Sequence, residues 1–102
     1  MARDAKMGPM VTVSGSKIKV AGGGSANEQI DVAIYSVVNN QDVTPAAYTT
    51  SGNLDANGSG TLTSAALSAG TYHVVTTAHP PGQNQVVYND TVVIPPTPPA
   101  GP

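Results

Sequence analysis

Cysteine is absent from this 102-residue chain, and so are phenylalanine and tryptophan. Without cysteine the chain can form no disulfide, no thiolate nucleophile and no zinc site of the cysteine type. Charged residues make up only 10% of the sequence, and no stretch approaches the roughly 18 apolar residues of a membrane span. The fold must therefore be held by a small aliphatic core or by assembly with partners.

A secretory leader is also not evident at the start of the sequence. The first ten residues contain three charged side chains and lack the apolar run of roughly seven or more residues that a signal peptide carries. We therefore expect a protein that is made in the cytoplasm and is not exported by this route.

The residues that are abundant point to β-structure. Valine occurs 13 times and threonine 11 times, against three leucines, and the chain holds 11 glycines and nine prolines. β-Branched side chains suit a pleated, half-buried surface, and glycine and proline mark frequent turns. A single all-β domain follows from this composition and from the length.

Composition also divides the chain into three parts. Residues 1–9 read as a flexible basic arm that ends at the breaker pair Gly8-Pro9. Residues 10–94 read as the folded domain. Residues 95–102 contain five prolines and should form an extended, polyproline-like tail.

Alternation of apolar and polar residues places the strands. Residues 29–38 form the clearest strand, with Ile30 on the face turned to the core and Asp31 on the other. Residues 10–13 and 17–20 alternate in the same way, and Gly15 between them suggests one strand kinked in the middle, each half joining a different sheet. About seven strands with frequent turns predict a two-sheet sandwich.

Three irregular positions are also indicated. The pair Asn57-Gly58 predicts a hairpin with a primed turn. Pro45 interrupts a weak strand and argues for an edge position or a late strand start. Alternation in the last strand slips at Asn89-Asp90, which suggests a bulge.

The stretch from Leu67 to Tyr72 predicts a corner that carries the chain from one sheet to the other. Gly70 can adopt a positive φ without steric cost. Tyr72 begins the next strand and can bury its ring while its hydroxyl bonds to upstream backbone, which is the tyrosine corner of immunoglobulin-like sandwiches. Leu67, Gly70 and Tyr72 are therefore the expected structural corner.

A family resemblance rests on three runs, residues 57–62, 67–72 and 91–94. Together they resemble the second half of bacterial and phage immunoglobulin-like domains, and the likeness spans roughly residues 10–95. Val74 stands two residues after the corner tyrosine, where antibody domains have cysteine. The resemblance implies an immunoglobulin-like sandwich of about seven strands with Greek-key connections, of the kind found in phage capsid decoration and other virion accessory proteins.

No catalytic or metal site is evident. Asp55, Asn57 and Ser59 match the first oxygen positions of a calcium loop, but its closing position is Ala66 instead of a glutamate. A plain Asn-Gly hairpin explains this run more simply. His73 and His79 lie six residues apart, and the acids are scattered singly. The sequence thus predicts no enzyme, no cofactor and no metal.

Basic residues are confined to the start of the chain, where Arg3, Lys6, Lys17 and Lys19 are opposed only by Asp4. The remaining residues hold five acids and no lysine or arginine, so the folded body is acidic and nucleic-acid binding is not favoured. Docking on a partner protein fits better. Met7 and Met10 would add adaptable apolar contacts, although a tail with no role fits the arm equally well.

Exposed apolar residues are a second feature that could mark an interface. Tyr35, Val75 and one register of residues 86–93 fall on outward faces in the predicted strands. If they lie together, they imply contact with a neighbouring subunit, and a register slip would instead bury them.

The functional expectation is a non-enzymatic structural accessory protein of a phage virion, namely a capsid decoration (cement) protein. It would be made in the host cytoplasm, bind the major capsid protein or another virion protein through the arm and a sheet edge, and have no membrane partner. It could also form homo-oligomers. The alternative is a cell-surface or adhesin-type module that binds carbohydrate or another surface ligand.

Overall fold

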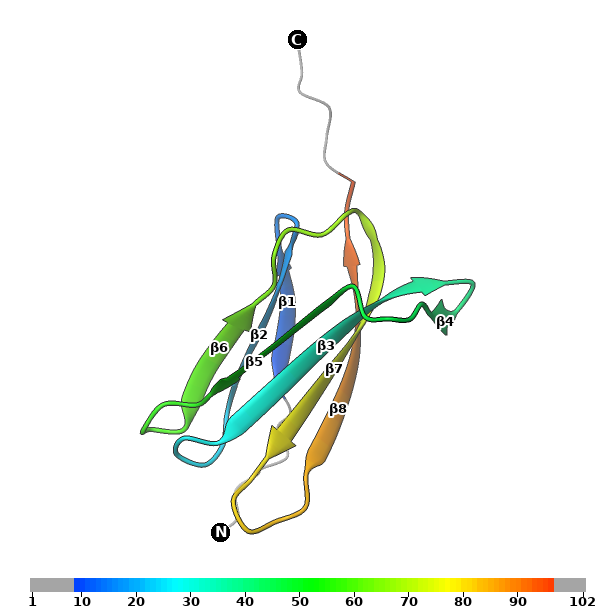
Figure 1. The fold of residues 1–102 in the computed structure, drawn as a ribbon. Helices are drawn as coiled ribbons and strands as arrows, with labels where there is room; N and C mark the ends of the chain where they lie inside the picture. Colours follow the sequence, from blue (N-terminus) through cyan, green and yellow to red (C-terminus); the bar gives the residue numbers. More distant parts are fainter. Residues whose placement is uncertain (1–8, 97–102) are drawn as a thin grey trace.

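The computed structural model describes residues 9–96, which form eight β-strands in two antiparallel sheets packed face to face (Figure 1). No helix occurs among these residues, and hence none that could cross a membrane. The strands are β1 (Met10–Ser14), β2 (Lys17–Gly23), β3 (Gln29–Val38), β4 (Gln41–Asp42), β5 (Tyr48–Asn53), β6 (Ser59–Thr63), β7 (Gly70–His79) and β8 (Val86–Ile94).

The smaller sheet has three strands in the order β1-β2-β6. The larger sheet has five strands, in which β3 pairs with β7, β7 pairs with β8, and both β4 and β5 pair with the remaining side of β3. The predicted all-β sandwich is confirmed. The structure has one strand more than expected because the two-residue β4 forms its own short hairpin with the end of β3.

The chain crosses between the sheets three times after β2. It crosses from β2 to β3, from β5 to β6, and from β6 to β7 (Figure 1). Since β2 pairs with β6 while β3 pairs with β7, these crossings interlock strands that are distant in sequence. The expected Greek-key type of connection is therefore present.

The prediction for the first two segments was wrong. Residues on both sides of Gly15 belong to the same sheet, because Gly15 (φ 63°) and Ser16 close a tight hairpin between β1 and β2. The antiparallel register sets Val11 opposite Val20, which places both alternating patterns with their apolar residues inward. Glycine can adopt the positive φ that either a tight hairpin or a strand kink requires, so Gly15 alone does not distinguish the two.

The predicted primed hairpin at Asn57-Gly58 is also wrong. β5 and β6 lie in different sheets, so this loop is a crossover, and Gly58 (φ 78°) has a positive φ while Asn57 does not. A primed turn appears at Asn39-Asn40 instead, where φ is 55° and 63° between β3 and β4. Such turns require positive φ at both central residues, which asparagine tolerates.

Two further expectations concern the sheet edges. β5 starts only at Tyr48, three residues after Pro45, and it borders the larger sheet, as the proline indicated. The bulge at Asn89-Asp90 is absent, because the β7–β8 ladder runs without interruption from Gly70↔Ile94 to Ala78↔Val86. The slip in alternation has another cause: Asp90 occupies an inward-facing position of an edge strand.

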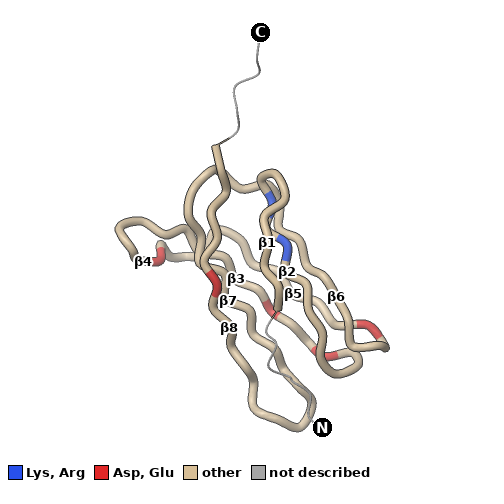
Figure 2. Tube along the Cα trace, turned by 180° about the vertical axis from the view of Figure 1, so that it is seen from behind, with Lys and Arg blue, Asp and Glu red and all other residues tan. Residues whose placement is uncertain are grey.

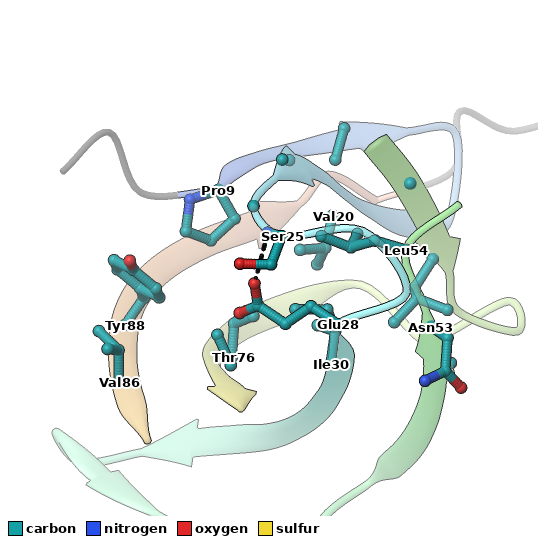
Figure 3. Close-up of a pocket in the computed structure, with 18 of the residues that line it drawn as sticks. Pro9, Val20, Ser25, Glu28, Ile30, Asn53, Leu54, Thr76, Val86 and Tyr88 are labelled. Atoms are coloured by element: carbon teal, nitrogen blue, oxygen red, sulfur yellow. Dashed lines mark hydrogen bonds between the residues drawn. The ribbon is translucent and has the colours of Figure 1, made fainter. Parts of the chain in front are cut away.

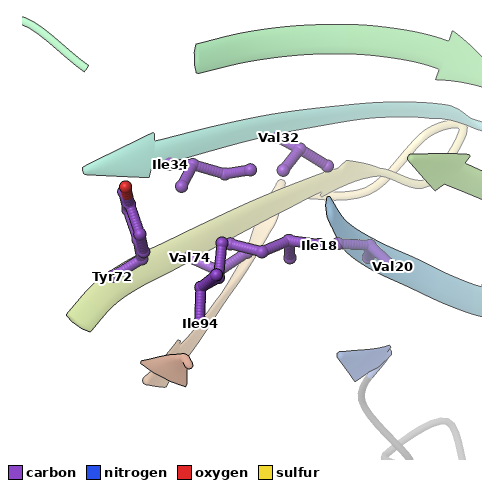
Figure 4. Close-up of a cluster of buried hydrophobic side chains, with 7 residues drawn as sticks. All are labelled: Ile18, Val20, Val32, Ile34, Tyr72, Val74 and Ile94. Carbon is purple, nitrogen blue, oxygen red and sulfur yellow. The ribbon is translucent and has the colours of Figure 1, made fainter. Parts of the chain in front are cut away.

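The core lies between the two sheets and is built from aliphatic side chains of both. Inward positions of β2, β3, β7 and β8 supply its buried members (Figure 4). They are Ile18, Val20, Val32, Ile34, Tyr72, Val74 and Ile94. Each sits at every second residue of its strand, which is the spacing that brings side chains to one face of a sheet.

The corner between β6 and β7 confirms the role predicted for Tyr72. Its side chain is 5% exposed, and its hydroxyl donates to the carbonyl oxygen of Ser68 at 2.7 Å. Gly70 opens β7 with φ 153°, and Leu67 packs partly buried against the core while its amide donates to the Ser16 carbonyl at 2.8 Å. The corner is thus tied to both sheets.

Candidate binding surfaces

The outward side of the three-stranded sheet carries the lysines of the described part of the chain. Lys17 and Lys19 are exposed on β2, Thr12 on β1 faces Lys19, and Met10 at the start of β1 is 68% exposed. Figure 2 shows both lysines along β2, apart from the acidic residues. We call the exposed residues Met10, Thr12, Lys17, Lys19, Thr61 and Thr63 the basic face.

Half of the predicted partner-binding residues can thus be placed. Met10, Lys17 and Lys19 lie on the basic face, with Met10 and Lys17 at opposite ends of the β1–β2 ladder, whereas Arg3, Lys6 and Met7 lie outside the described residues. Pro9 is the first described residue and directly precedes β1.

The outward side of the five-stranded sheet carries two histidine–carboxylate pairs, which we call the histidine face. His73 Nδ1 lies 2.8 Å from Asp42 Oδ2, and His79 Nε2 lies 2.7 Å from Asp31 Oδ2. Tyr35 stands beside the first pair, with its ring centroid 6.3 Å from that of His73. The sequence reasoning missed both pairs, because they join residues 31 and 48 positions apart.

Both ring nitrogens of His73 have acceptors. Nδ1 faces the Asp42 carboxylate, and Nε2 lies 2.8 Å from the side-chain oxygen of Asn89. Two acceptors favour the doubly protonated ring, so the hydrogen bond to Asp42, and then that to Asn89, raise the pKa of His73 above its ordinary 6.5. The position that a nucleophile would take beside Nε2 is filled by an amide oxygen.

The His73–Asp42 pair predicts a pH dependence of stability. The pKa of His73 is raised in the folded state, so the contribution of the pair is complete below the ordinary pKa and is lost as pH rises through the folded value. Asp42→Asn should lower the His73 pKa in an NMR titration and destabilise the protein near about pH 6 more than near about pH 9.

The matched control for this titration is Asp55→Asn. The Asp55 carboxylate accepts hydrogen bonds from backbone amides of its own loop and pairs with no histidine. An unchanged His73 pKa in Asp42→Asn, or an equal shift in Asp55→Asn, would show that the carboxylate does not hold the imidazolium.

The run that resembles the start of a calcium loop has a structural role. Asp55 Oδ1 accepts from the amides of Asn57 at 2.8 Å and Ser59 at 3.0 Å, and these bonds, that from Ser59 first, lower the pKa of Asp55. The carboxylate closes the loop that carries the chain between the sheets. Within residues 9–96, no three His, Asp or Glu side chains gather closely enough to hold a metal.

The outward apolar residues predicted from the sequence lie on the five-stranded sheet. Tyr35, Val75, Val87 and Val93 are on its outward side, where Val75 pairs with Ala33 on one side and Asn89 on the other. Contact of this face with a neighbouring subunit stays a prediction.

A cavity of about 940 Å³ opens between the sheets at the end of the sandwich that holds the β2–β3 and β7–β8 loops (Figure 3). Its lining is mixed, with the aliphatic Val20, Ile30 and Leu54 beside polar residues such as Ser25 and Asn53. Glu28 and Thr76 both point into it. Sequence reasoning had no signal for this cavity, because its lining comes from seven separate segments.

Comparison of the chain with protein-family models, with curated proteins and with solved structures found no match.

Proposed function

We propose that this protein is a non-enzymatic structural accessory protein of a phage virion, namely a capsid decoration (cement) protein. It docks on the major capsid protein, or on another virion protein, through its N-terminal segment and the neighbouring sheet edge. The proposal places the protein in the virion after synthesis in the host cytoplasm. The immunoglobulin-like resemblance of residues 57–62, 67–72 and 91–94 supports the choice of class.

The observation that carries the docking part of the proposal is the separation of charge. Lys17 and Lys19 lie on the basic face, while Asp31 and Asp42 lie on the opposite side of the sandwich. Such separation orients a protein against a charged surface before contact forms. The basic face therefore suits an acidic partner surface, with the more acidic side turned away from it.

The mode of contact we propose is strand addition at β1. β1 is an edge strand of the three-stranded sheet, because it pairs there with β2 on one side only. In the sequence, the basic residues 1–9 directly precede it. Strand addition uses main-chain hydrogen bonds, so it needs few particular side chains. The lysines would then add orientation and the exposed Met10 an apolar anchor.

Charge reversal on the basic face tests this function. The double variant Lys17→Glu/Lys19→Glu should weaken association with intact particles of the cognate phage about tenfold or more, because it sets like charges against the partner. The control, Thr49→Glu/Ser51→Glu, also introduces two glutamates, at outward positions of β5 on the other sheet, and removes no lysine. Equal binding by both double variants, or no binding by the unaltered protein, would overturn the proposal.

The alternative is a surface module that binds carbohydrate. One observation favours it: the partly exposed ring of Tyr35 stands on the histidine face beside polar groups of His73 and Asn89. Sugar sites combine an aromatic platform with convergent hydrogen-bonding groups. Saturable glycan binding that is lost in Tyr35→Ala and kept in Lys17→Glu/Lys19→Glu would decide for this module.

A further inference from the structure

The cavity arises because several inward positions at one end of the sandwich carry small side chains or none. On β2 the inward series of Ile18 and Val20 continues with Gly22, which pairs with Gly60 on β6. On β7 the inward series ends with Ala78, which also lines the cavity. Every second residue of a strand lies on the same face, so larger residues here would extend the core. The two sheets therefore enclose space at this end instead of a packed interior.

Two polar side chains point into this space (Figure 3). Thr76 is 2% exposed, and its hydroxyl has no hydrogen-bond partner among the described residues. Glu28 is 6% exposed, and its Oε1 accepts from the Ser25 amide at 2.7 Å. Neither ion pair within residues 9–96 involves Glu28. A buried carboxylate without a counter-charge and an unpaired buried hydroxyl both cost free energy unless an occupant bonds to them.

We propose that this cavity binds a small organic ammonium ion, with its cationic head between the Glu28 carboxylate and the Thr76 hydroxyl. An ammonium group carries three donors and no acceptor, so both protein groups are suitable partners for it. It also brings the positive charge that the described residues do not place beside Glu28. The same carboxylate would repel an anionic head, and a neutral head would leave it without a counter-charge.

The size and the lining of the cavity favour a small molecule with an apolar body. Its volume of about 940 Å³ is within the range of small-molecule sites and is far more than one lysine side chain of a partner would fill. Ile30, Leu54 and Leu62 offer aliphatic surface to the body of the ligand. Tyr88 also lines the cavity, directly across the β7–β8 ladder from Thr76, where its ring can face a cation.

Titration of the full chain with hexylammonium, followed by NMR of the backbone amides, tests the proposal. Saturable shifts are expected at cavity residues such as Ile30 and Thr76. Hexanoate has an aliphatic stem of similar length and the opposite charge, and it should bind at least about tenfold more weakly. This comparison uses the unaltered protein, so it does not depend on the folding of a variant. It also involves no phage particle, so its outcome is independent of the proposed function.

Variants then assign the cationic head to its partners. Glu28→Gln keeps an oxygen for the Ser25 amide but removes the charge, and it should weaken hexylammonium binding about tenfold or more while 1-hexanol binding stays unchanged. Asp31→Asn is the matched control, because it removes one carboxylate on the histidine face and should leave hexylammonium binding unchanged. Thr76→Val removes the hydroxyl at nearly constant shape and should also weaken hexylammonium binding.

Four outcomes would overturn the proposal. The first is the absence of saturable shifts at cavity residues up to about 10 mM hexylammonium. The second is binding of hexanoate as tight as that of hexylammonium. The third is equal weakening in Glu28→Gln and Asp31→Asn, which would reflect net charge alone. The fourth is tighter binding of Nα-acetyl-lysine N-methylamide than of hexylammonium, because the occupant would then be a lysine side chain of a partner protein.

Discussion

Gly58→Ala is expected to destabilise the domain by about 3 kcal/mol, although the residue lies in a loop. Its φ of 78° costs a residue with a side chain about 1–2 kcal/mol. An added Cβ would also collide with the carbonyl oxygen of Gly24, which is backbone and cannot rotate away. Overpacking of this kind costs a further 1–3 kcal/mol or so.

The close approach at Gly58 has a structural purpose. Gly58 is buried, and its carbonyl oxygen accepts from the Gly24 amide at 2.8 Å, which joins the β5–β6 crossover to the β2–β3 loop. A second contact, from the Leu54 amide to the Glu28 carbonyl at 2.8 Å, holds the same two loops. Displacing Gly58 therefore disturbs the end of the sandwich that forms the cavity.

Gly82→Ala is the matched control for this prediction. Gly82 has a similar φ of 71°, but no atom lies within 4 Å of its added Cβ. Urea unfolding of both variants, followed by circular dichroism, separates backbone strain from crowding. If the two losses of stability differ by less than about 1 kcal/mol, the contact between the added Cβ at position 58 and the Gly24 carbonyl oxygen contributes no measurable destabilisation.

Tyr72→Ala is expected to have the largest effect, a loss of about 4 kcal/mol in the free energy of unfolding. The substitution removes a buried aromatic ring and leaves a cavity in a core that has no phenylalanine or tryptophan. The ring packs at the corner end of β7, close to where the chain enters the larger sheet (Figure 4). Many domains of this size are stable by only about 5–10 kcal/mol, so the variant should unfold at markedly lower urea concentration.

Tyr72→Phe separates the hydroxyl from the ring. It keeps the packing and removes the hydrogen bond to the Ser68 carbonyl, at an expected cost of about 1 kcal/mol. Tyr35→Phe is the control, because that ring stands on the outward side of β3 and its change should stay within about 0.5 kcal/mol. Equal stability of the two phenylalanine variants would mean that the hydrogen bond from the Tyr72 hydroxyl to the Ser68 carbonyl does not stabilise the corner.

Local patterns in the sequence were sufficient where the physical cause is itself local. Alternation along β3 identified the inward residues, because side chains of a strand point to opposite faces in turn. The corner at Tyr72 was also predictable, since its hydrogen bond spans four residues. Pro45 marked the late start of an edge strand because it cannot donate to a ladder.

Features that depend on pairing between distant strands could not be read in this way. Gly15 allowed either a kink or a hairpin, and only the register of β1 on β2 decides between them. Asn57-Gly58 looked like a hairpin because a dipeptide preference does not report whether the flanking strands share a sheet. In the sequence, Asp90 appeared to interrupt the alternation of apolar and polar residues. The β7–β8 pairing is nevertheless continuous, and Asp90 occupies a regular position in it opposite Val74.

The sequence by itself therefore determined the class of fold, the faces of the strands and the corner, all of which follow from side-chain periodicity and short-range backbone geometry. The tertiary structure alone decided which functional groups meet. It set His73 against Asp42, placed the described lysines and the Asp31 and Asp42 carboxylates on opposite sides of the sandwich, and directed the Glu28 and Thr76 side chains into one cavity. Such meetings depend on inter-strand register and on the packing of two sheets, which no window of neighbouring residues contains.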